Sequence, residues 1–486
     1  MMSCYFFPVL FGGRVKNDYF CIVNLYDVCD MKQSLLSLLF LMVALPMSAQ
    51  KDAASLSKSY QQSAFALFNA LAKQETDNVC FSPLSVQIAL SMAQNGASGN
   101  TLKQLQQALG TEGFTNEEIG QFNGKLTKTL TNRPPFDPEK YAWYGDEDPE
   151  KIYNREYPQC ELANSLWTRP DVQLYDDFVQ TLRNSYDAGV DAVYFDTWEG
   201  IEKINAWANE RTHGLIPYIY QEPQSSDLDV VLANALYFKG SWTYEFEREA
   251  TSQKPFFLDD ETYVNVDMMC AREVFNMAET PSFYTVTLYY GMTFDYSMTL
   301  FVPIEGTALP PLTYEDWYAA MQGKSQPMNL YVPRFQIDGN YPLKEVLQEL
   351  GVTDAFDYNA DFTKMSEVNR CVSNIFQLSK IQVDEKGTEA AAVTVIGFSK
   401  GMDPNHFIDF KVDRPFYFTI QSREADAILF TGRVTHFSGV QNHWQDGISA
   451  SQATPETSPC FDLQGRKLPA APQKGFFIQN GRKRMR

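Results

Sequence analysis

Residues 383–402, with the sequence VDEKGTEAAAVTVIGFSKGM, have the composition of a β-strand at a place where the chain calls for a loop. They open with a charged turn, Asp384–Gly387, and continue through small and β-branched residues, which favour strands. Glu389 is the only charge before Lys400, and glycines and Pro404 close the segment. The segment is too weakly apolar to anchor a core. The fold must therefore account for a strand-like segment that stands where a loop is expected.

The composition of the 486-residue chain is that of a globular protein, with 44% hydrophobic and 14% aromatic residues. Length alone suggests two or three domains. The formal net charge of −20 argues against a nucleic-acid partner, because a phosphate backbone requires a basic surface. An acidic surface keeps a protein soluble, and we assign the charge to that role.

The N-terminal region has the pattern of a secretion signal. A basic stretch begins at Met31, an apolar run follows over residues 35–45, and cleavage is expected near Ala49. The apolar run is too short to span a bilayer. We therefore expect residues 31–49 to be the signal peptide of a protein secreted to the periplasm or the extracellular space. Residues 1–30 fit no targeting pattern and are expected to be an over-extended N-terminus.

Neither the cysteines nor the histidines form a metal-binding pattern. The cysteines left after cleavage are scattered and include no CxxC pair, so we expect mostly buried free thiols and no zinc site. They are Cys80, Cys160, Cys270, Cys371 and Cys460. The four histidines form no HExxH motif, and no GxxxxGK phosphate loop is present. The sequence therefore predicts no metal and no cofactor.

Helical patterns come first in the chain and strand patterns follow. Ser82 followed by Pro83 predicts a helix start, and Thr101 with Gln104 predicts a capping box for the next helix. Residues 231–242, VLANALYFKGSW, predict an apolar strand, and short strand-like segments follow after residue 255. This order predicts an α+β fold with a large mixed sheet.

Two segments depart from this pattern. Residues 133–158 are rich in proline, acidic residues and tyrosine, and are expected to be a surface insertion. Periodicity is lost after residue 439, and residues 441–486 are expected to form a linker and a short, basic, hairpin-like tail. The globular domain is therefore expected to span residues 50–440.

The pentapeptide GFSKG, residues 397–401, fits the GxSxG motif of hydrolases. Ser399 would be the nucleophile, and Asp409 or Asp413 and then His436 follow in the order that hydrolases use. The motif requires a long helix after the serine, whereas an alternating apolar pattern with a proline follows here. We therefore expect the protein not to be an enzyme and keep a hydrolase only as an unfavoured alternative.

Four long motifs stand in the order and spacing of the serpin family. They are NVCFSPLSVQIALSMAQNGASGNT (78–101), VLANALYFKGSW (231–242), VDEKGTEAAA (383–392) and FKVDRPFYFTI (410–420). The chain resembles a serpin from about Ser59 to Phe437, interrupted mainly by the insertion. The tail resembles, much more weakly, short C-terminal segments of secreted proteins from gut Bacteroidetes. The serpin resemblance implies one domain of about eight or nine helices over three β-sheets, with an exposed reactive-centre loop.

The resemblance also implies what the strand-like segment does. In serpins a protease cuts this loop and is trapped as an acyl-enzyme when the loop inserts as a new strand in the central sheet. The chain is thus expected to be a metastable, monomeric serine-protease inhibitor acting as a suicide substrate. The alternative is a non-inhibitory serpin with a binding role. Such relatives tend to carry charged or bulky residues where insertion begins, whereas this chain has GTEAAAVT.

The loop sequence fits a strand with two unlike faces. Alternate residues from Thr388 to Phe398 carry no charge, and the only charge, Glu389, lies on the other face. The first face can therefore be buried without an unpaired ion. The resemblance assigns the loop hinge to Glu385, Gly387, Thr388, Glu389, Ala390, Ala391 and Ala392.

The resemblance further assigns a cluster where strands of the central sheet part. Its members are Ser82, Ser85, Asn234 and Gln377, with Trp242 at the end of the sheet where insertion starts. Gln377 stands where the family usually has a histidine. The cluster therefore keeps a hydrogen-bonding side chain there but has no protonatable ring.

Counting residues from the hinge gives the position of the reactive bond only approximately. In the serpins that this chain resembles, cleavage follows about sixteen residues after the hinge acid, here Glu385, which leads to Gly401. The bond Lys400–Gly401 suits the acidic pocket of a trypsin-like protease, and Met402–Asp403 suits a chymotrypsin- or elastase-like pocket. We favour the first bond and keep the second as the alternative. The expected partner is a serine protease, or else a cysteine protease.

Overall fold

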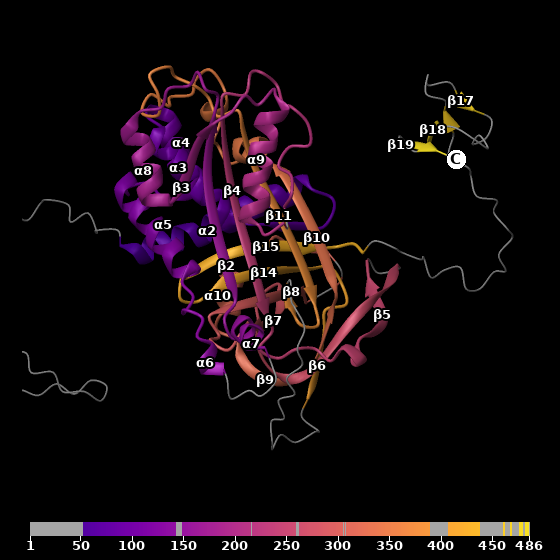
Figure 1. Cartoon of the computed structure of the whole chain (residues 1–486). Coiled ribbons are helices and arrows are strands. Elements are labelled where there is room, and N and C mark those ends of the chain that lie inside the picture. The colour runs from indigo at the N-terminus through magenta and orange to yellow at the C-terminus, as the bar shows by residue number, and fades with distance from the viewer. Residues whose placement is uncertain are drawn as a thin grey trace, which may run out of the picture. The chain divides into compact units, whose positions relative to one another are not determined.

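The computed structural model in Figure 1 describes most of the chain between residues 52 and 437. The described residues are 52–141, 148–214, 216–258, 262–304, 306, 308–388 and 407–437, together with four short strands between residues 460 and 485. The expected signal peptide lies outside the described residues.

The first part of the described chain is helical, as its sequence predicts. Ser82 caps its helix by accepting the N–H of Ser85 at 3.3 Å, and Pro83 follows at the first helical position. The capping box expected at Thr101 is wrong, because the helix begins earlier, at Gly99. Thr101 is buried within that helix and accepts the N–H of Asp361 at 2.9 Å, so a tertiary contact decides its role.

The α-helices of the described residues are α2 (Ala53–Gln74), α3 (Pro83–Gly96), α4 (Gly99–Leu109), α5 (Asn116–Thr131), α6 (Pro138–Tyr141), α7 (Pro149–Glu156), α8 (Asp176–Tyr186), α9 (Trp198–Arg211), α10 (Tyr314–Ala320) and α11 (Lys344–Glu349). Two 3₁₀ turns are η2 (Arg248–Ala250) and η3 (Asp354–Phe356). Helices α6 and α7 belong to the insertion, and the other helices cover the sheets.

A six-stranded sheet has the order β10-β11-β12-β4-β2-β3. Its strands are β10 (Phe335–Pro342), β11 (Asn374–Asp384), β12 (Gly387–Thr388), β4 (Val230–Ser241), β2 (Gln159–Thr168) and β3 (Ala188–Ala192). Helix α9 packs across one face, where Val231 and Ala233 meet Ile201 and Ile204 (Figure 1). On the opposite face Leu232 joins the main core, which also contains the buried face of α3. The β4 segment is thus buried on both sides, as its apolar sequence predicts.

A nine-stranded sheet has the order β1-β15-β14-β8-β7-β6-β9-β13, with β5 paired to β6. Its strands are β1 (Val79–Phe81), β5 (Ser252–Phe257), β6 (Tyr263–Glu279), β7 (Phe283–Tyr289), β8 (Tyr296–Pro303), β9 (Lys324–Pro333), β13 (Ile408–Lys411), β14 (Phe416–Ser422) and β15 (Ala427–Val434). Strand β6 has 17 residues and pairs with β5, β7 and β9, so it joins two groups of strands into one sheet. The predicted α+β class with a large mixed sheet is confirmed.

The insertion folds around its own small core. Tyr141 of α6 and Ile152 and Tyr153 of α7 are buried against one another, with Tyr157 beside them. Residues 142–147 lie outside the described residues. Proline supplies the first position of α7 and Asp148 caps it by accepting the N–H of Glu150, which fixes where that helix starts.

The described strands of the tail form a separate small sheet with the order β17-β16-β18-β19. They are β16 (Cys460–Phe461), β17 (Lys467–Leu468), β18 (Phe476–Gln479) and β19 (Arg482–Met485). The last two strands pair antiparallel and form a hairpin.

Candidate functional site

Strands β4 and β11 part within the six-stranded sheet. They run parallel and pair from Asn374↔Val231 to Gln377↔Asn234. Beyond Gln377, among the residues that the structure describes, the facing edges of β11 and β4 have no ladder partner over residues 378–382 and 235–239. Such an unpaired edge exposes a row of backbone donors and acceptors to any strand that can enter.

The loop hinge begins inside this opening. Gly387 and Thr388, which form β12, pair antiparallel with Ser241 and Gly240 of β4 on one side. On the other side the same two residues pair with Asp384 and Val383 of β11. A Cβ at Gly387 would collide with the carbonyl oxygen of Gly240, so only glycine allows this close approach. Two residues of the chain, Gly387 and Thr388, are therefore already paired between β11 and β4.

Two stacked aromatic residues pack against the hinge. Tyr290 and Trp242 stack with ring centroids 4.3 Å apart, and both are buried. The hydroxyl of Tyr290 lies 2.6 Å from that of Thr388, whose exposed fraction is 3%. Burial raises the pKa of Tyr290 well above its ordinary value, so the phenol is a neutral hydrogen-bonding group.

The indole of Trp242 fixes the turn that leads into the hinge. Its Nε1–H donates to the carbonyl of Asp384 at 2.9 Å, and its backbone N–H donates to the carbonyl of Lys386 at 2.7 Å. The carboxylate of Asp384 in turn accepts the N–H groups of Lys386 and Gly387 at 2.9 and 3.3 Å. The charged turn of the sequence is thus a tightly bonded corner between β11 and β12.

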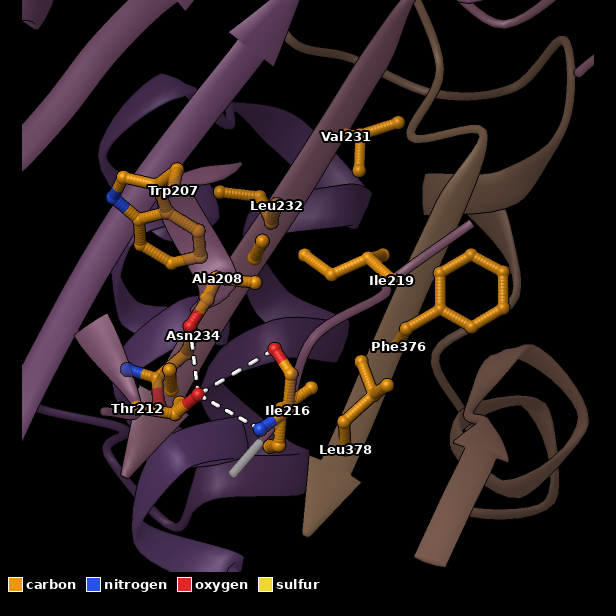
Figure 2. A pocket seen from close by; sticks show the side chains of 12 residues that line it. Trp207, Ala208, Thr212, Ile216, Ile219, Val231, Leu232, Asn234, Phe376 and Leu378 are labelled. Carbon is orange, nitrogen blue, oxygen red and sulfur yellow. Dashed lines mark hydrogen bonds between the residues drawn. The ribbon is translucent and has the colours of Figure 1, made fainter. Parts of the chain in front are cut away.

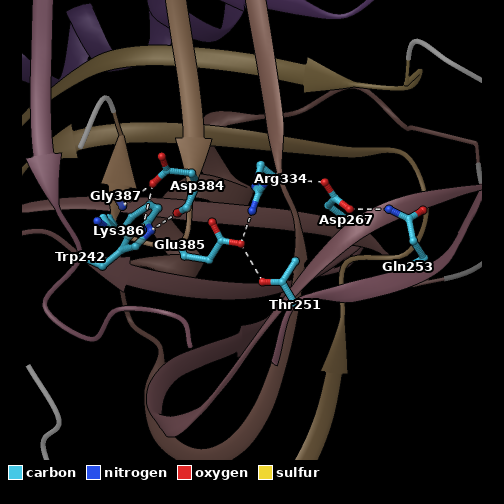
Figure 3. A network of polar contacts seen from close by, with 9 residues as sticks. All are labelled: Trp242, Thr251, Gln253, Asp267, Arg334, Asp384, Glu385, Lys386 and Gly387. Carbon is cyan, nitrogen blue, oxygen red and sulfur yellow. Dashed lines mark hydrogen bonds and ion pairs between the residues drawn. The ribbon is translucent and has the colours of Figure 1, made fainter. Parts of the chain in front are cut away.

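Glu385 anchors the other side of this turn, as Figure 3 shows. Its carboxylate forms an ion pair with Arg334 and accepts the hydroxyl of Thr251 at 2.7 Å. Arg334 also contacts Asp267 at 3.4 Å. Burial by itself raises the pKa of Glu385, but the hydrogen bonds from Thr251 and Arg334 outweigh it and lower that pKa below its ordinary value. Glu385 is therefore charged at neutral pH, with its charge compensated.

Three buried amides lie side by side where the strands meet. Asn234 is opposite Asn164 of β2 on one side and Gln377 on the other. The amide of Asn234 donates to Asn164, whose own amide donates to the carbonyl of Tyr186 at 2.7 Å. The side-chain oxygens of Asn234 and Gln377 are buried without a hydrogen-bond partner. Such unsatisfied acceptors destabilise the present arrangement of the sheet.

The two serines of the expected cluster bond to each other rather than to these amides. Ser82 donates to the hydroxyl of Ser85 at 2.9 Å, and both are buried. Within the described part of the chain, no hydrogen bond joins this pair to Asn234 or Gln377. Gln377 and Asn234 are neighbours in the strand pairing, but their side chains bond elsewhere, to the carbonyl of Leu378 and to Asn164. The structure therefore does not join the four expected polar residues into one hydrogen-bonded cluster.

A small cavity of about 10 Å³ lies between α9 and the point where β4 and β11 part (Figure 2). It is lined by Trp207 of α9, by Ile219 from the segment after that helix, and by Phe376 and Leu378 of β11. Thr212 and Asn234 add polar groups to this otherwise apolar lining. The cavity indicates that the sheet is imperfectly packed at the opening.

Several expected site residues lie outside the described residues. They are Glu389, Ala390, Ala391 and Ala392 of the hinge and Lys400, Gly401, Met402 and Asp403 of the two candidate bonds. Ser399, the nucleophile of the hydrolase alternative, lies there too. Strand β13, not a long helix, follows this segment, and the ring of His436 bonds to Thr435. This arrangement does not resemble the strand–serine–helix unit that GxSxG hydrolases require.

Sequence analysis did not identify Asn164, Arg334, Thr251 or Tyr290 as site residues. An amide in the apolar strand pattern ELANSLW was a usable signal for Asn164, because a polar side chain in a buried strand needs a partner. The other three have no local signal, since each meets the hinge from a distant part of the chain.

The described residues contain no group of His, Cys, Asp or Glu side chains that could hold a metal ion. None of the helices placed by the structure is long and apolar enough to cross a membrane. Cys80 and Cys160 are buried free thiols, and Cys270 and Cys371 are half-buried free thiols.

Comparisons with known proteins agree on one family. The family model described as Serpin (serine protease inhibitor) matches residues 58–437. Iripin-3 of Ixodes ricinus is 31% identical over 386 residues, covering 74% of this chain and 89% of the relative. Neuroserpin of Homo sapiens is 30% identical over 403 residues, covering 76% and 89%.

Two solved structures resemble the fold closely. The native state of tengpin, a thermophilic serpin, has a TM-score of 0.67 at 26% identity, covering 78% of this chain and 93% of the other. Cleaved serpin 42Da has a TM-score of 0.66 at 26% identity, covering 79% and 100%.

Proposed function

Because this chain belongs to the serpin family, whose members are generally protease inhibitors, we propose that it is a suicide-substrate inhibitor of serine proteases. The serpin fold expected from the sequence is confirmed by the family match and the solved structures. A protease cuts the loop that follows Thr388 at its reactive bond, becomes covalently attached as an acyl-enzyme, and is trapped when the loop enters the sheet between β4 and β11.

The observation that carries the proposal is the position of β12. Gly387 and Thr388 pair with both β4 and β11 in the antiparallel sense that a returning loop must adopt. The next residues can continue along two edges that have no partner over residues 378–382 and 235–239 of the described chain. Entry beyond that point must separate the β4–β11 pairs that begin at Gln377↔Asn234. Each added residue completes backbone hydrogen bonds, so insertion is favourable once cleavage frees the loop end.

The sequence of the loop agrees with entry into this opening. The hinge residues Ala390, Ala391 and Ala392 are small, and the face that contains Thr388 carries no charge. About sixteen residues at ~3.3 Å each form a strand of ~50 Å, long enough to carry a bound protease from one end of the domain to the other. A non-inhibitory serpin, by contrast, has no need for a hinge that can enter the sheet.

The proposed reactive bond is Lys400–Gly401, which suits a trypsin-like target. Its test is to mix the mature protein with trypsin, elastase and subtilisin and to look for SDS-resistant complexes. We expect a complex with trypsin and a released peptide that begins at Gly401. Release of a peptide beginning at Asp403, together with a complex with elastase, would instead assign the bond Met402–Asp403.

Matched variants separate the two bonds. Lys400→Ala should abolish the trypsin complex, whereas Met402→Ala, two residues away, should leave it intact. Cleavage of the loop by all three proteases without any complex would refute inhibition and would favour a non-inhibitory serpin with a binding role.

We also propose that the protein acts outside the cytoplasm as a monomer. The signal-peptide pattern of residues 31–49 supports export, and the monomeric state is an expectation from the family resemblance. Intact-mass measurement of the exported protein should find Gln50 at or near the N-terminus. A mature protein that retains residues 31–49 would contradict this part of the proposal.

A further inference from the structure

The insertion is firmly built on both sides of residues 142–147. The hydroxyl of Tyr141 donates to the carboxylate of Glu156 at 2.7 Å, and that of Tyr153 donates to the carbonyl of Pro134 at 2.6 Å. The guanidinium of Arg133 lies over the ring of Tyr153 at 4.4 Å and donates to the carbonyl of Tyr157 at 2.6 Å. These contacts connect the segment after α5, residues 133–134, with α6 and α7, so the end of the insertion has a defined position.

That end rests against the turn between β7 and β8. The N–H of Met292 donates to the carbonyl of Glu156 at 3.0 Å. Gly291 has φ of +64°, and a Cβ there would lie 2.5 Å from the Glu156 oxygen and 2.7 Å from Pro158. The two backbones are therefore in direct contact, and movement of the insertion must displace the turn.

The turn carries the tyrosine that contacts the hinge. Gly291 follows Tyr290 directly, and its N–H donates to the carbonyl of Ser241 at 2.8 Å. Tyr290 stacks on Trp242 and reaches the hydroxyl of Thr388. A short chain of contacts thus runs from Glu156 through Gly291 and Tyr290 to Thr388, with each member buried or bonded through its backbone.

We propose that the described parts of the insertion, residues 133–141 and 148–158, are a brace that fixes Tyr290 against Thr388 and so keeps the hinge within the sheet. The brace determines how readily Gly387 and Thr388 leave the sheet and how readily the residues after them enter it. Tyr290 is its positioning residue. This proposal rests on the proposed function for its consequence in trapping, but not for its structural test.

The structural test is hydrogen–deuterium exchange at the Gly387 and Thr388 amides without any protease. Tyr290→Phe keeps the ring stack and removes one buried hydrogen bond, so exchange there should become roughly two- to tenfold faster. Tyr153→Ala removes the centre of the brace and should accelerate exchange at the same amides. The matched controls are Tyr358→Phe and Tyr318→Ala, which change exposed tyrosines at 93% and 54% exposure.

A double variant decides whether the brace acts through Tyr290. Tyr153→Ala combined with Tyr290→Phe should accelerate hinge exchange no more than Tyr290→Phe alone, because both changes break the same chain of contacts. Additive acceleration, or acceleration confined to residues 133–158, would overturn the proposal. If Tyr153→Ala fails to fold, Tyr141→Phe removes only the bond to Glu156 and carries the same prediction with a smaller effect.

Trapping gives a second, separable readout. When the hinge is released, insertion must begin again at Gly387, so more acyl-enzyme hydrolyses first. Tyr290→Phe should therefore raise the number of inhibitor molecules consumed per trapped protease roughly two- to tenfold. If the unmodified protein traps no protease, the proposed function fails, whereas the exchange measurement still confirms or refutes the brace.

Discussion

Along its β2 edge, strand β4 is paired without interruption from Val230 to Lys239, whereas along its β11 edge the pairing stops at Asn234. Both edges belong to the same backbone, so the composition of β4 cannot explain the difference. The difference lies in the partner: β2 lies along the first edge, whereas under the proposed function the strand that fits the other edge is supplied by the loop. The proposed mechanism then withholds the hydrogen bonds of that edge until the loop is cut.

The largest expected effect is that cleavage of the loop gives β4 a paired strand along its β11 edge as well as along its β2 edge. Cutting the loop within residues 396–402 should let the loop pair with β4 on one side and β11 on the other, first along the unpartnered edges and then by parting the pairs that begin at Gln377↔Asn234. At about 1 kcal/mol per hydrogen bond and about 2–4 °C per kcal/mol, the melting temperature should rise by tens of degrees. Because this stability is kinetic, unfolding rates at fixed temperature are the measurement. Equal unfolding rates of cut and intact protein would contradict the inhibitory mechanism.

A charge on the inward-facing side of the loop strand should prevent the loop from inserting between β4 and β11. Thr388→Arg places a cation against Tyr290 in a buried site, at a cost of several kcal/mol. Since ~1.4 kcal/mol is tenfold in rate, insertion should lose to hydrolysis, and the protein should become a substrate. The measurement is the ratio of cleaved inhibitor to covalent complex.

The matched control for this change is the neighbouring residue. Glu389→Arg replaces one charge by another on the opposite face and should leave trapping largely intact. Ser399→Ala tests the hydrolase alternative in the same assay. Unchanged stoichiometry in both arginine variants, or loss of activity in the serine variant alone, is incompatible with loop insertion.

A smaller effect concerns the corner where β11 leaves its neighbour. Glu385→Gln removes the charge that Arg334 pairs with and should lower stability by roughly 1–2 kcal/mol, since Arg334 is 37% exposed and solvent screens part of the interaction. Asp267→Asn is the control, because that carboxylate contacts the same guanidinium at 3.4 Å but is itself 47% exposed.

The same variant tests the pH dependence. The pKa of Glu385 is lowered in the folded state, so its contribution is present above the ordinary carboxyl pKa and is lost as pH falls through the folded value. Melting curves of the original protein and Glu385→Gln should therefore differ at pH 7 and converge in acid. A difference that persists at low pH would show that charge is not the cause.

The smallest expected effect lies at the last paired position, Gln377. Gln377→His introduces a buried ring whose protonated form is disfavoured by desolvation, so its folded pKa should lie below the unfolded value of about 6.5. Stability should then decrease below that pH by at most about 1.4 kcal/mol per pH unit, whereas the original side chain gives no such slope. Parallel slopes for both proteins between pH 5 and 7 would contradict this expectation.

Local signals in the sequence predict local structure well. The cap at Ser82 and the buried strand at residues 231–242 follow from neighbouring residues and are confirmed. Thr101 and Gln104 show where this reasoning fails. Their spacing fits a capping box, but Thr101 accepts a bond from Asp361 and the amide of Gln104 reaches Asp354 instead. Contacts between distant segments override a local pattern of two residues.

The site is less predictable than the fold for the same reason. Glu385 meets Arg334 and Thr251, and Thr388 meets Tyr290, across separations of 51, 134 and 98 residues. The family resemblance supplies the hinge and the amides but no partner for them. The two residues of β12 are also too few for any periodicity, so their pairing follows only from the three-dimensional arrangement.

The contact between Gly387 and Gly240 also fixes the register in which the loop pairs with β4. Because no side chain fits at this crossing, the pairing cannot slip by one residue without a collision, and every later residue inherits its face from this point. Between Thr388 and the proposed reactive bond, inserting or deleting one residue should therefore differ in effect from inserting or deleting two. A change of one residue turns all residues beyond it to the opposite face, whereas a change of two preserves the faces and alters only the length.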